Sequence, residues 1–117
     1  MPFQREVVEV QFRCPPDGEF KNHPVVVMSN DDINEHEGAF LAMMMTSHDW
    51  DDAYSFPVDD SDFIKSLGER EHTEMRLHLV SQFLVTDIIP NGNPNNSMKK
   101  ESFMRLMEHF NEITIGV

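Results

Sequence analysis

Cysteine is almost absent from this chain of 117 residues, which contains only Cys14. A single cysteine excludes an internal disulfide and is typical of proteins in a reducing compartment. Long apolar runs are missing as well, since the longest extends from Ala39 to Met45 and a membrane-spanning helix needs about 18 or more apolar residues. The start of the chain lacks the pattern of a secretory signal. We expect one cytoplasmic domain, residues 1–117, that does not enter a membrane.

Motifs of several enzyme classes are also absent. There is no glycine-rich phosphate loop, no serine lies in a Gly-x-Ser-x-Gly elbow, no histidine pair has HExxH spacing, and Cys14 has no CxxC partner. Histidine lies near acidic residues in two places, namely His48 with Asp49 and Asp51, and His72 with Glu71 and Glu74. We interpret both groups as solvated side chains. The sequence therefore predicts no metal site and no cofactor.

Basic residues are few, because nine lysines and arginines stand against 21 acidic residues and the formal net charge is −12. The stretch from Asp31 to Glu74 holds thirteen acidic and two basic residues, and the rest of the chain holds eight and seven. A protein of this charge repels nucleic acid at long range. The acidic stretch predicts either a solvated face that aids solubility or a docking surface for a basic partner.

Two strands are expected in the first quarter of the chain. Residues alternate between apolar and polar in Glu6–Arg13, which predicts a half-buried strand. In the run His23-Pro24-Val25-Val26-Val27-Met28-Ser29-Asn30, proline favours an extended chain and the three valines predict a strand that is buried on both faces. The turn signal Cys14–Gly18 joins the two strands into an antiparallel hairpin. Its long loop is expected to hold Glu19, Lys21 and His23 together.

The rest of the chain predicts more strands and a closing helix. Ala39–Thr46 is expected to be a strand, with a helix as the alternative. Met75–Asp87 is expected to be a long strand with its odd-numbered residues on one face. Two short strands are expected at Tyr54–Val58 and Ile113–Ile115. Asp32–Gly38 is either a helical turn or a loop, a brief helix begins at Asp60 or Ser61 and stops at Gly68, and Asn91–Asn96 is a loop. Phe103, Leu106, Met107 and Phe110 recur with helical spacing. About five strands and one helix predict a mainly β, α+β fold, either a small antiparallel barrel or a strongly bent sheet.

Polar side chains gather where the predicted strands begin and end, namely Glu19, Lys21, His23, Thr46, Ser47, Arg76 and His78. If the two central strands adjoin, Thr46 at the end of one approaches His23 at the start of the other. A carboxylate, an imidazole, a hydroxyl and an arginine are sufficient for metal-free RNA cleavage, in which proton transfers accompany stabilisation of a charged phosphorane. The alternative is that these are loop residues without a special role.

The segment His23–Asn30, followed by an apolar strand that ends in Thr46-Ser47, resembles the PemK/MazF-like toxins of bacterial type II toxin–antitoxin systems. Their pattern is Arg-Pro-x-x-Val-(Leu/Ile)-Ser with a following Asn, and then an apolar strand ending in Thr. The resemblance extends to Val7–Phe12, to Arg76–Asp87 and to the terminal helix, and so covers most of the chain.

This resemblance implies an SH3-like barrel, usually homodimeric, that cleaves single-stranded RNA without metal and is inhibited by a cognate antitoxin. His23 occupies the position of the family's catalytic arginine, Thr46 falls on the catalytic threonine, and Glu19 lies near an assisting acidic residue. Because histidine replaces arginine, Lys21 or Arg76 would stabilise the phosphorane and His23 would act as an acid or base. The strong acidity is another departure from many RNA-binding proteins.

The sequence supports two alternative functions for this protein. The first is a metal-independent endoribonuclease toxin that cleaves mRNA, with His23, Thr46, Arg76 and Glu19 as catalytic residues and with Lys21, Ser47 and His78 binding RNA. The second is a non-catalytic SH3-like interaction module whose acidic segment, Asp49–Asp62, docks a basic partner.

Overall fold

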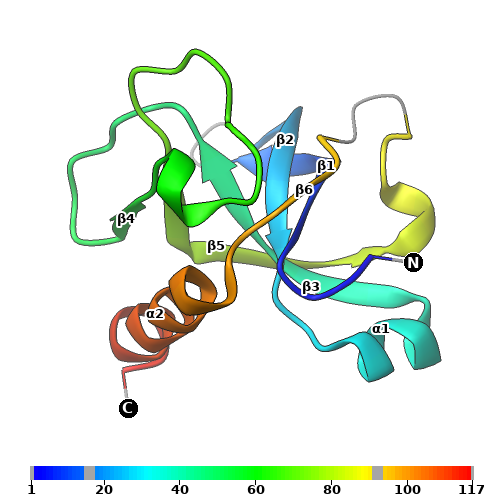
Figure 1. Ribbon diagram of the computed structural model, residues 1–117. Helices are drawn as coiled ribbons and strands as arrows, with labels where there is room; N and C mark the ends of the chain where they lie inside the picture. Colours follow the sequence, from blue (N-terminus) through cyan, green and yellow to red (C-terminus); the bar gives the residue numbers. More distant parts are fainter. Residues whose placement is uncertain (1, 15–17, 91–93, 117) are drawn as a thin grey trace.

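The computed structural model describes residues 2–14, 18–90 and 94–116, which form a six-stranded antiparallel sheet of order β4-β5-β3-β2-β1-β6 (Figure 1). The strands are β1 (Glu6–Cys14), β2 (Glu19–Val27), β3 (Ala39–Thr46), β4 (Ser55–Pro57), β5 (Glu74–Leu84) and β6 (Asn96–Ser97). The helices are α1 (Asp31–Glu37) and α2 (Lys100–Phe110), with 3-10 turns η1 (Asp60–Asp62) and η2 (Val85–Asp87) and a π-helical turn η3 (Asn111–Ile115). The sheet is not closed into a barrel, because β4 and β6 remain its two edges. The predicted mainly β fold is confirmed, whereas the predicted closure is wrong.

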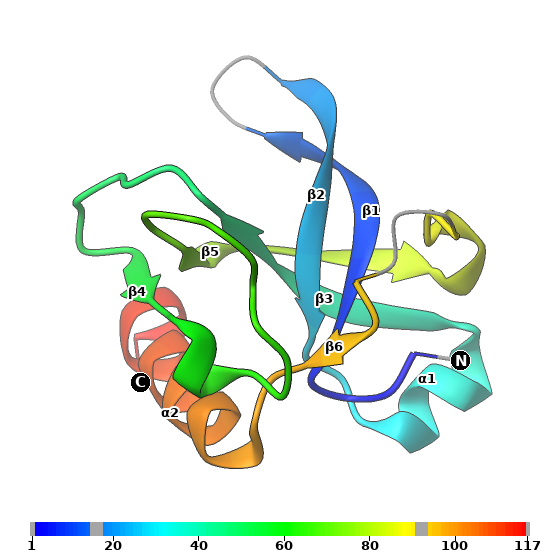
Figure 2. The same cartoon turned by 45° about the horizontal axis from the view of Figure 1, so that its top comes forward.

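The hairpin of β1 and β2 is confirmed, and it is longer than expected. Pairing runs from Val7–Val26 to Cys14–Glu19, and the outer part of the hairpin projects beyond the rest of the sheet (Figure 2). Glu19, Lys21 and His23 were expected in a loop, but they lie within β2 because the ladder to β1 continues past the valines. Most of the predicted turn at Cys14–Gly18, and residues 91–93 of the predicted loop at Asn91–Asn96, lie outside the described residues.

The valines of β2 lie between two apolar clusters, as the sequence predicts. Val26 packs with residues of β3, β5 and α2, including Met43, Met75 and Leu106. Val25 and Val27 pack on the opposite face, in a cluster contributed by β1, β2, β3 and β5. Burying each such side chain contributes about 1.5–3 kcal/mol. Pairing of β2 with β3 begins only at Val25, the residue after Pro24, which has no N–H group to donate.

Strand β3 has the predicted bounds, α2 is the predicted amphipathic helix, and residues 31–37 form a helix, one of the two predicted options. The brief helix expected between Asp60 and Gly68 is limited to η1, because Phe63 leaves the turn to pair with Met98. The strand expected at Ile113–Ile115 is instead part of η3, where the Thr114 hydroxyl donates to the carbonyl of Leu77. The short strand β6 was not predicted.

Strand β5 changes faces along its length, which the sequence did not indicate. Met43 pairs with Val80 but Met45 pairs with Met75, so β5 contains extra residues at this point. As a result Met75 and Leu77 pack in the cluster beneath α2, while Leu79 and Phe83 pack on the opposite face. The prediction that all odd-numbered residues of this strand share one face is therefore wrong. Among the described residues, no helix is both long and apolar enough to cross a membrane.

Candidate functional site

Three neighbouring strands place polar side chains on one face of the sheet. Thr46, the last residue of β3, pairs with Glu74 of β5, and Ser55 of β4 pairs with Arg76. Opposed residues of an antiparallel pair share a face, and so do residues two apart on a strand. The four side chains therefore meet on the same face, and the structure brings together two of the predicted residues, Thr46 and Arg76.

Arg76 is the centre of a buried network of ion pairs. Its Nη1 and Nη2 atoms donate to the two oxygens of Asp52, at 2.9 Å each, and Nη1 also donates to Oε2 of Glu74 at 2.9 Å. Ser55 accepts from Nη1 at 2.9 Å and donates to Glu74 at 2.6 Å. Arg76 is 4% exposed and Glu74 is 0% exposed. Both terminal nitrogens of Arg76 thus donate within the protein, whereas its buried Nε atom has no hydrogen-bond partner among the described residues.

The network also fixes the charges of its members. Burial would raise the pKa of the Glu74 carboxyl, but hydrogen bonds from Ser55, His72 and Arg76 and from the Trp50 backbone hold that pKa below its ordinary value. Burial would lower the pKa of Arg76, and the two carboxylates raise it above its ordinary value instead. The guanidinium holds the pKa of Asp52 well below its usual range. All three groups are therefore charged at neutral pH.

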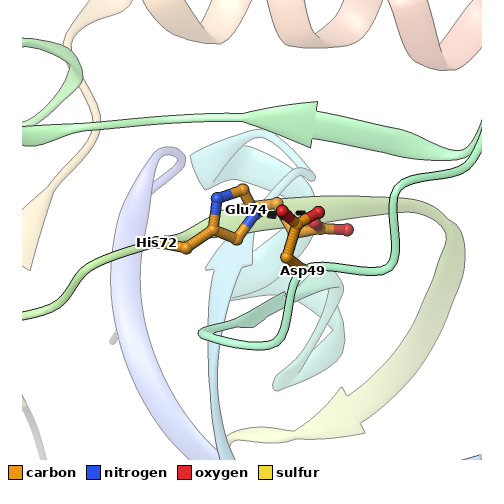
Figure 3. A group of neighbouring side chains, drawn as sticks. All are labelled: Asp49, His72 and Glu74. Atoms are coloured by element: carbon orange, nitrogen blue, oxygen red, sulfur yellow. Dashed lines mark hydrogen bonds and ion pairs between the residues drawn. The ribbon is translucent and has the colours of Figure 1, made fainter.

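Further polar groups extend the network towards solvent. Nε2 of His72 lies 2.8 Å from Oε1 of Glu74 and 3.9 Å from Oδ1 of Asp49 (Figure 3). The backbone N–H of Trp50 donates to the same Glu74 oxygen at 3.3 Å, and the Trp50 ring lies 5.2 Å from the Arg76 guanidinium. The donor set of one imidazole and two carboxylates is one that can hold a metal ion.

Thr46 is buried at the end of β3, beside this network. Its Oγ1 atom accepts a hydrogen bond from the backbone N–H of His48 at 3.2 Å. This contact orients the hydroxyl and uses an acceptor position, so the hydroxyl proton remains available for donation.

His23 lies on β2, opposite Val10 of β1, and is half-buried. The pair Val25–Met44 is the last on the β2–β3 ladder, and two further steps in the same register would bring His23 level with Thr46 on the same face. The Nε2 atom of His23 is buried and has no hydrogen-bond partner among the described residues. Burial lowers the pKa of this imidazole, the charge of Lys21 lowers it further, and Glu9 opposes them. His23 is therefore neutral at pH 7.

Glu19 and Lys21 lie on the exposed outer part of β2, where they form an ion pair of 3.8 Å. Glu19 is four residues from His23, about 13 Å along an extended strand. The structure therefore does not bring its carboxylate to the imidazole. Lys21 is close enough for its charge to act on His23.

Ser47 and His78, the other RNA-binding candidates, are both exposed and lie apart. Ser47 lines a cleft of about 630 Å³ together with Asp49, Glu69, Arg70, Glu71 and His72. The ring of His78 lies 4.9 Å from that of Tyr54. Burial and the nearby charge of Arg76 lower the pKa of His78, although Asp52 opposes them.

A second cleft, of about 660 Å³, lies between the β1–β2 hairpin and the far end of β5. Its lining includes Arg13, Phe20, Asn22 and Gln82, and none of the predicted site residues. The volume of a cleft is therefore no guide to the position of the polar network around Arg76.

Sequence reasoning missed the partners of Arg76. Asp52 and Ser55 lie in or beside a short segment more than 20 residues away, and Glu74 was assigned to a charged connection instead of the strand. The sequence did contain one indication of the contact between Glu74 and Arg76. The two residues are two positions apart, so their side chains lie on the same face of a strand that begins at Glu74.

Comparison with known proteins places this geometry in context. A family model described as PemK-like, MazF-like toxin of type II toxin-antitoxin system matches residues 3–83. No curated protein matches the chain by sequence. An endoribonuclease in complex with its cognate antitoxin, from a mycobacterial species, matches with a TM-score of 0.72 and 12% identity over 100% of this chain and 97% of that chain.

Two other solved structures are similar. A MazE-MazF complex from Deinococcus radiodurans has a TM-score of 0.70 and 12% identity, covering 96% of this chain and 94% of that chain. An endoribonuclease from a mycobacterial species has a TM-score of 0.66 and 14% identity, covering 99% and 92%. At these identities the likeness establishes a shared fold, and the family model independently matches more than half of the chain. The chain therefore belongs to the PemK-like, MazF-like toxins of type II toxin–antitoxin systems.

Proposed function

We propose that this protein is a cytoplasmic endoribonuclease toxin that cleaves single-stranded RNA, such as mRNA, without a metal ion. The observation that carries the proposal is the buried and unpartnered Nε2 atom of His23, which the β2–β3 register, continued two residues beyond its last pair, would place on the same sheet face as Thr46. Burial lowers the pKa of this imidazole, and a neutral imidazole can accept a proton. The family match supports a toxin, and several structural relatives are endoribonucleases.

In the proposed reaction His23 is the general base. Its neutral imidazole takes the proton of a ribose 2′-hydroxyl, and the 2′ oxygen attacks the adjacent phosphorus. The bond from phosphorus to the 5′ oxygen breaks, and that oxygen takes a proton from water. The hydroxide that remains takes the proton from His23, which restores the neutral imidazole. The products are a 2′,3′-cyclic phosphate and a 5′-hydroxyl. Thr46 donates to the phosphoryl oxygen that gains charge, and Lys21 supplies a positive charge close to His23.

Arg76 has a different role in this proposal from the one that the sequence suggested. Because Asp52, Glu74 and Ser55 occupy its terminal nitrogens, Arg76 is a positioning residue that holds Glu74 opposite Thr46. Glu19 is too far from His23 to assist it directly. Ser47 and His78 are exposed, and in this proposal they contact the bound RNA.

Incubation of the purified protein with a single-stranded RNA in EDTA tests the proposal. We expect fragments that end in a 2′,3′-cyclic phosphate, and we expect no cleavage of a DNA strand of the same sequence, which lacks the 2′-hydroxyl. RNA that stays intact over a wide range of protein concentrations and RNA sequences would refute the enzymatic proposal.

The second candidate is a non-catalytic module that docks a basic partner. The exposed acidic residues of the segment 49–62, such as Asp51, Asp59 and Asp60, favour it, as does the engagement of Arg76 by carboxylates. In that case Asp51→Lys would weaken partner binding most strongly at low salt, whereas His23→Ala would have no effect.

The proposed toxin has two kinds of partner, a second copy of the chain and an antitoxin. The mycobacterial relative was solved with its cognate antitoxin and the Deinococcus relative with MazE, and we propose a homodimer that a cognate antitoxin inhibits. Induction of the chain alone would then arrest growth, and co-expression of the antitoxin would restore it. Unimpaired growth at high expression would count against a toxin.

A further inference from the structure

Asp49, His72 and Glu74 form a cluster of possible metal ligands that the sequence divided between two separate groups. Asp49 follows β3 in the connection to β4, whereas His72 lies just before β5 and Glu74 is the first residue of β5. The sheet brings them together, and Figure 3 shows the imidazole of His72 facing the carboxylates of Asp49 and Glu74, which overlap in this view. One donor atom from each residue lies within 4.8 Å of the other two.

The spacing of the donor atoms suits a small divalent ion. Nε2 of His72 is 2.8 Å from the Glu74 oxygen and 3.9 Å from the Asp49 oxygen. Ligands bound at about 2.0–2.2 Å in a tetrahedral arrangement lie about 3.4 Å apart. An ion between the three groups therefore requires only small side-chain movements, together with replacement of the hydrogen bond between His72 and Glu74.

The surroundings of the three residues also fit a cation. The second oxygen of Glu74 is held by Ser55 and Arg76, so its carboxylate is oriented as metal-binding carboxylates usually are. The charge of Arg76 is offset by the paired carboxylate of Asp52. Glu69 and Glu71 line the adjoining cleft, and the side chain of Asp49 is 64% exposed, which leaves a route for an ion to enter.

We propose that Asp49, His72 and Glu74 bind one divalent transition-metal ion, for which Zn²⁺ is the natural probe. One imidazole nitrogen and two carboxylate oxygens suit Zn²⁺ better than Mg²⁺ or Ca²⁺, which favour oxygen ligands alone. The ion fastens the connection between β3 and β4 to the start of β5 and takes no part in RNA cleavage. The proposal is therefore independent of the proposed nuclease function.

Calorimetric titration of the EDTA-treated and dialysed full chain with ZnCl₂ tests this site. We expect one ion per chain, and a weaker response to MgCl₂. Asp49→Asn and His72→Gln should each weaken Zn²⁺ binding by about tenfold or more. The exposed carboxylate of Asp49 and the glutamine amide in place of the imidazole allow both variants to fold.

Two neighbouring residues provide matched controls. Asp51→Asn and His48→Gln change the same residue types, both in the connection between β3 and β4, but lie outside the cluster, so both should bind Zn²⁺ as the unaltered chain does. A second readout is the melting temperature, which should rise with Zn²⁺ concentration and should not do so in Asp49→Asn. The absence of Zn²⁺ binding, or equal binding by all four variants, would overturn the proposal.

Discussion

His23 is half-buried, and its Nε2 atom has neither solvent nor a hydrogen-bond partner among the described residues. A histidine held in this way is kept neutral by its surroundings, since burial and the charge of Lys21 both lower its pKa. A neutral imidazole can accept a proton at physiological pH, which arginine cannot do. The imidazole of His23 can therefore serve as the proposed base, a role that a permanently charged arginine could not fill.

The pKa of His23 can be measured by NMR titration of its imidazole. We expect a value below 6.5, and we expect Lys21→Gln to raise it and Glu9→Gln to lower it. Between the lowered pKa and 6.5 the unfolded chain binds more protons than the folded one, so His23 makes the free energy of unfolding increase with pH across this range. A pKa above 6.5 would contradict the described burial.

Arg76 is expected to matter for stability. Arg76→Ala leaves the carboxylate of Glu74 buried without its cation, and removal of one partner of a buried pair costs about 3–5 kcal/mol of unfolding free energy. Urea denaturation measures this loss.

Arg105→Ala is the matched control, because Arg105 is 56% exposed in its ion pair with Asp62. Its loss should cost less than about 1 kcal/mol. Equal losses for the two variants would show that the network around Arg76 contributes no more than a surface ion pair.

The site residues differ in how far the sequence could predict them. His23 and Thr46 could be proposed because a proline and an apolar run mark the positions of their strands, which the structure confirms. Asp52 could not be identified, because it lies in an irregular connection and meets Arg76 only through the pairing of β4 with β5. A contact between residues 24 apart depends on the tertiary fold and not on local periodicity.

At the scale of elements, local patterns predicted the strands and the terminal helix, but not how the strands bend. The irregularity in β5 opposite β3 changes the face on which its residues lie, and the alternation of Met75–Asp87 contains no sign of it. Closure into a barrel depends on the cumulative twist and stagger of all strands. This is why a bent sheet and a barrel both remained possible from sequence.

The end of helix α1 at Gly38 can be tested by substitution of this glycine. Gly38 ends this helix in the left-handed region, with φ of 61°, and open space surrounds the position of a Cβ atom. Gly38→Ala should therefore lose about 1–2 kcal/mol of unfolding free energy from backbone strain alone. Gly38→Asn should lose less, because asparagine tolerates this conformation better. Equal stability of the alanine variant in urea denaturation would contradict the assigned backbone conformation.

For the whole molecule, the sheet combines a family fold with an unusual charge. Thirteen acidic and two basic residues lie between Asp31 and Glu74. Two of these acidic residues, Asp52 and Glu74, form ion pairs with Arg76. The remaining negative charge would slow the approach of RNA, so the proposed activity depends on close contacts at the strand ends and not on a broad basic surface.

In the proposed reaction His23 and Thr46 act together on RNA at one face of the open sheet. Single-turnover cleavage of single-stranded RNA in EDTA should therefore be measured for the unaltered chain, His23→Ala and Thr46→Ala. We expect His23→Ala to lower the rate by about 10²–10⁴-fold and Thr46→Ala to lower it as well, with both variants folded. A folded His23→Ala variant that cleaves RNA as fast as the unaltered chain would contradict the proposal.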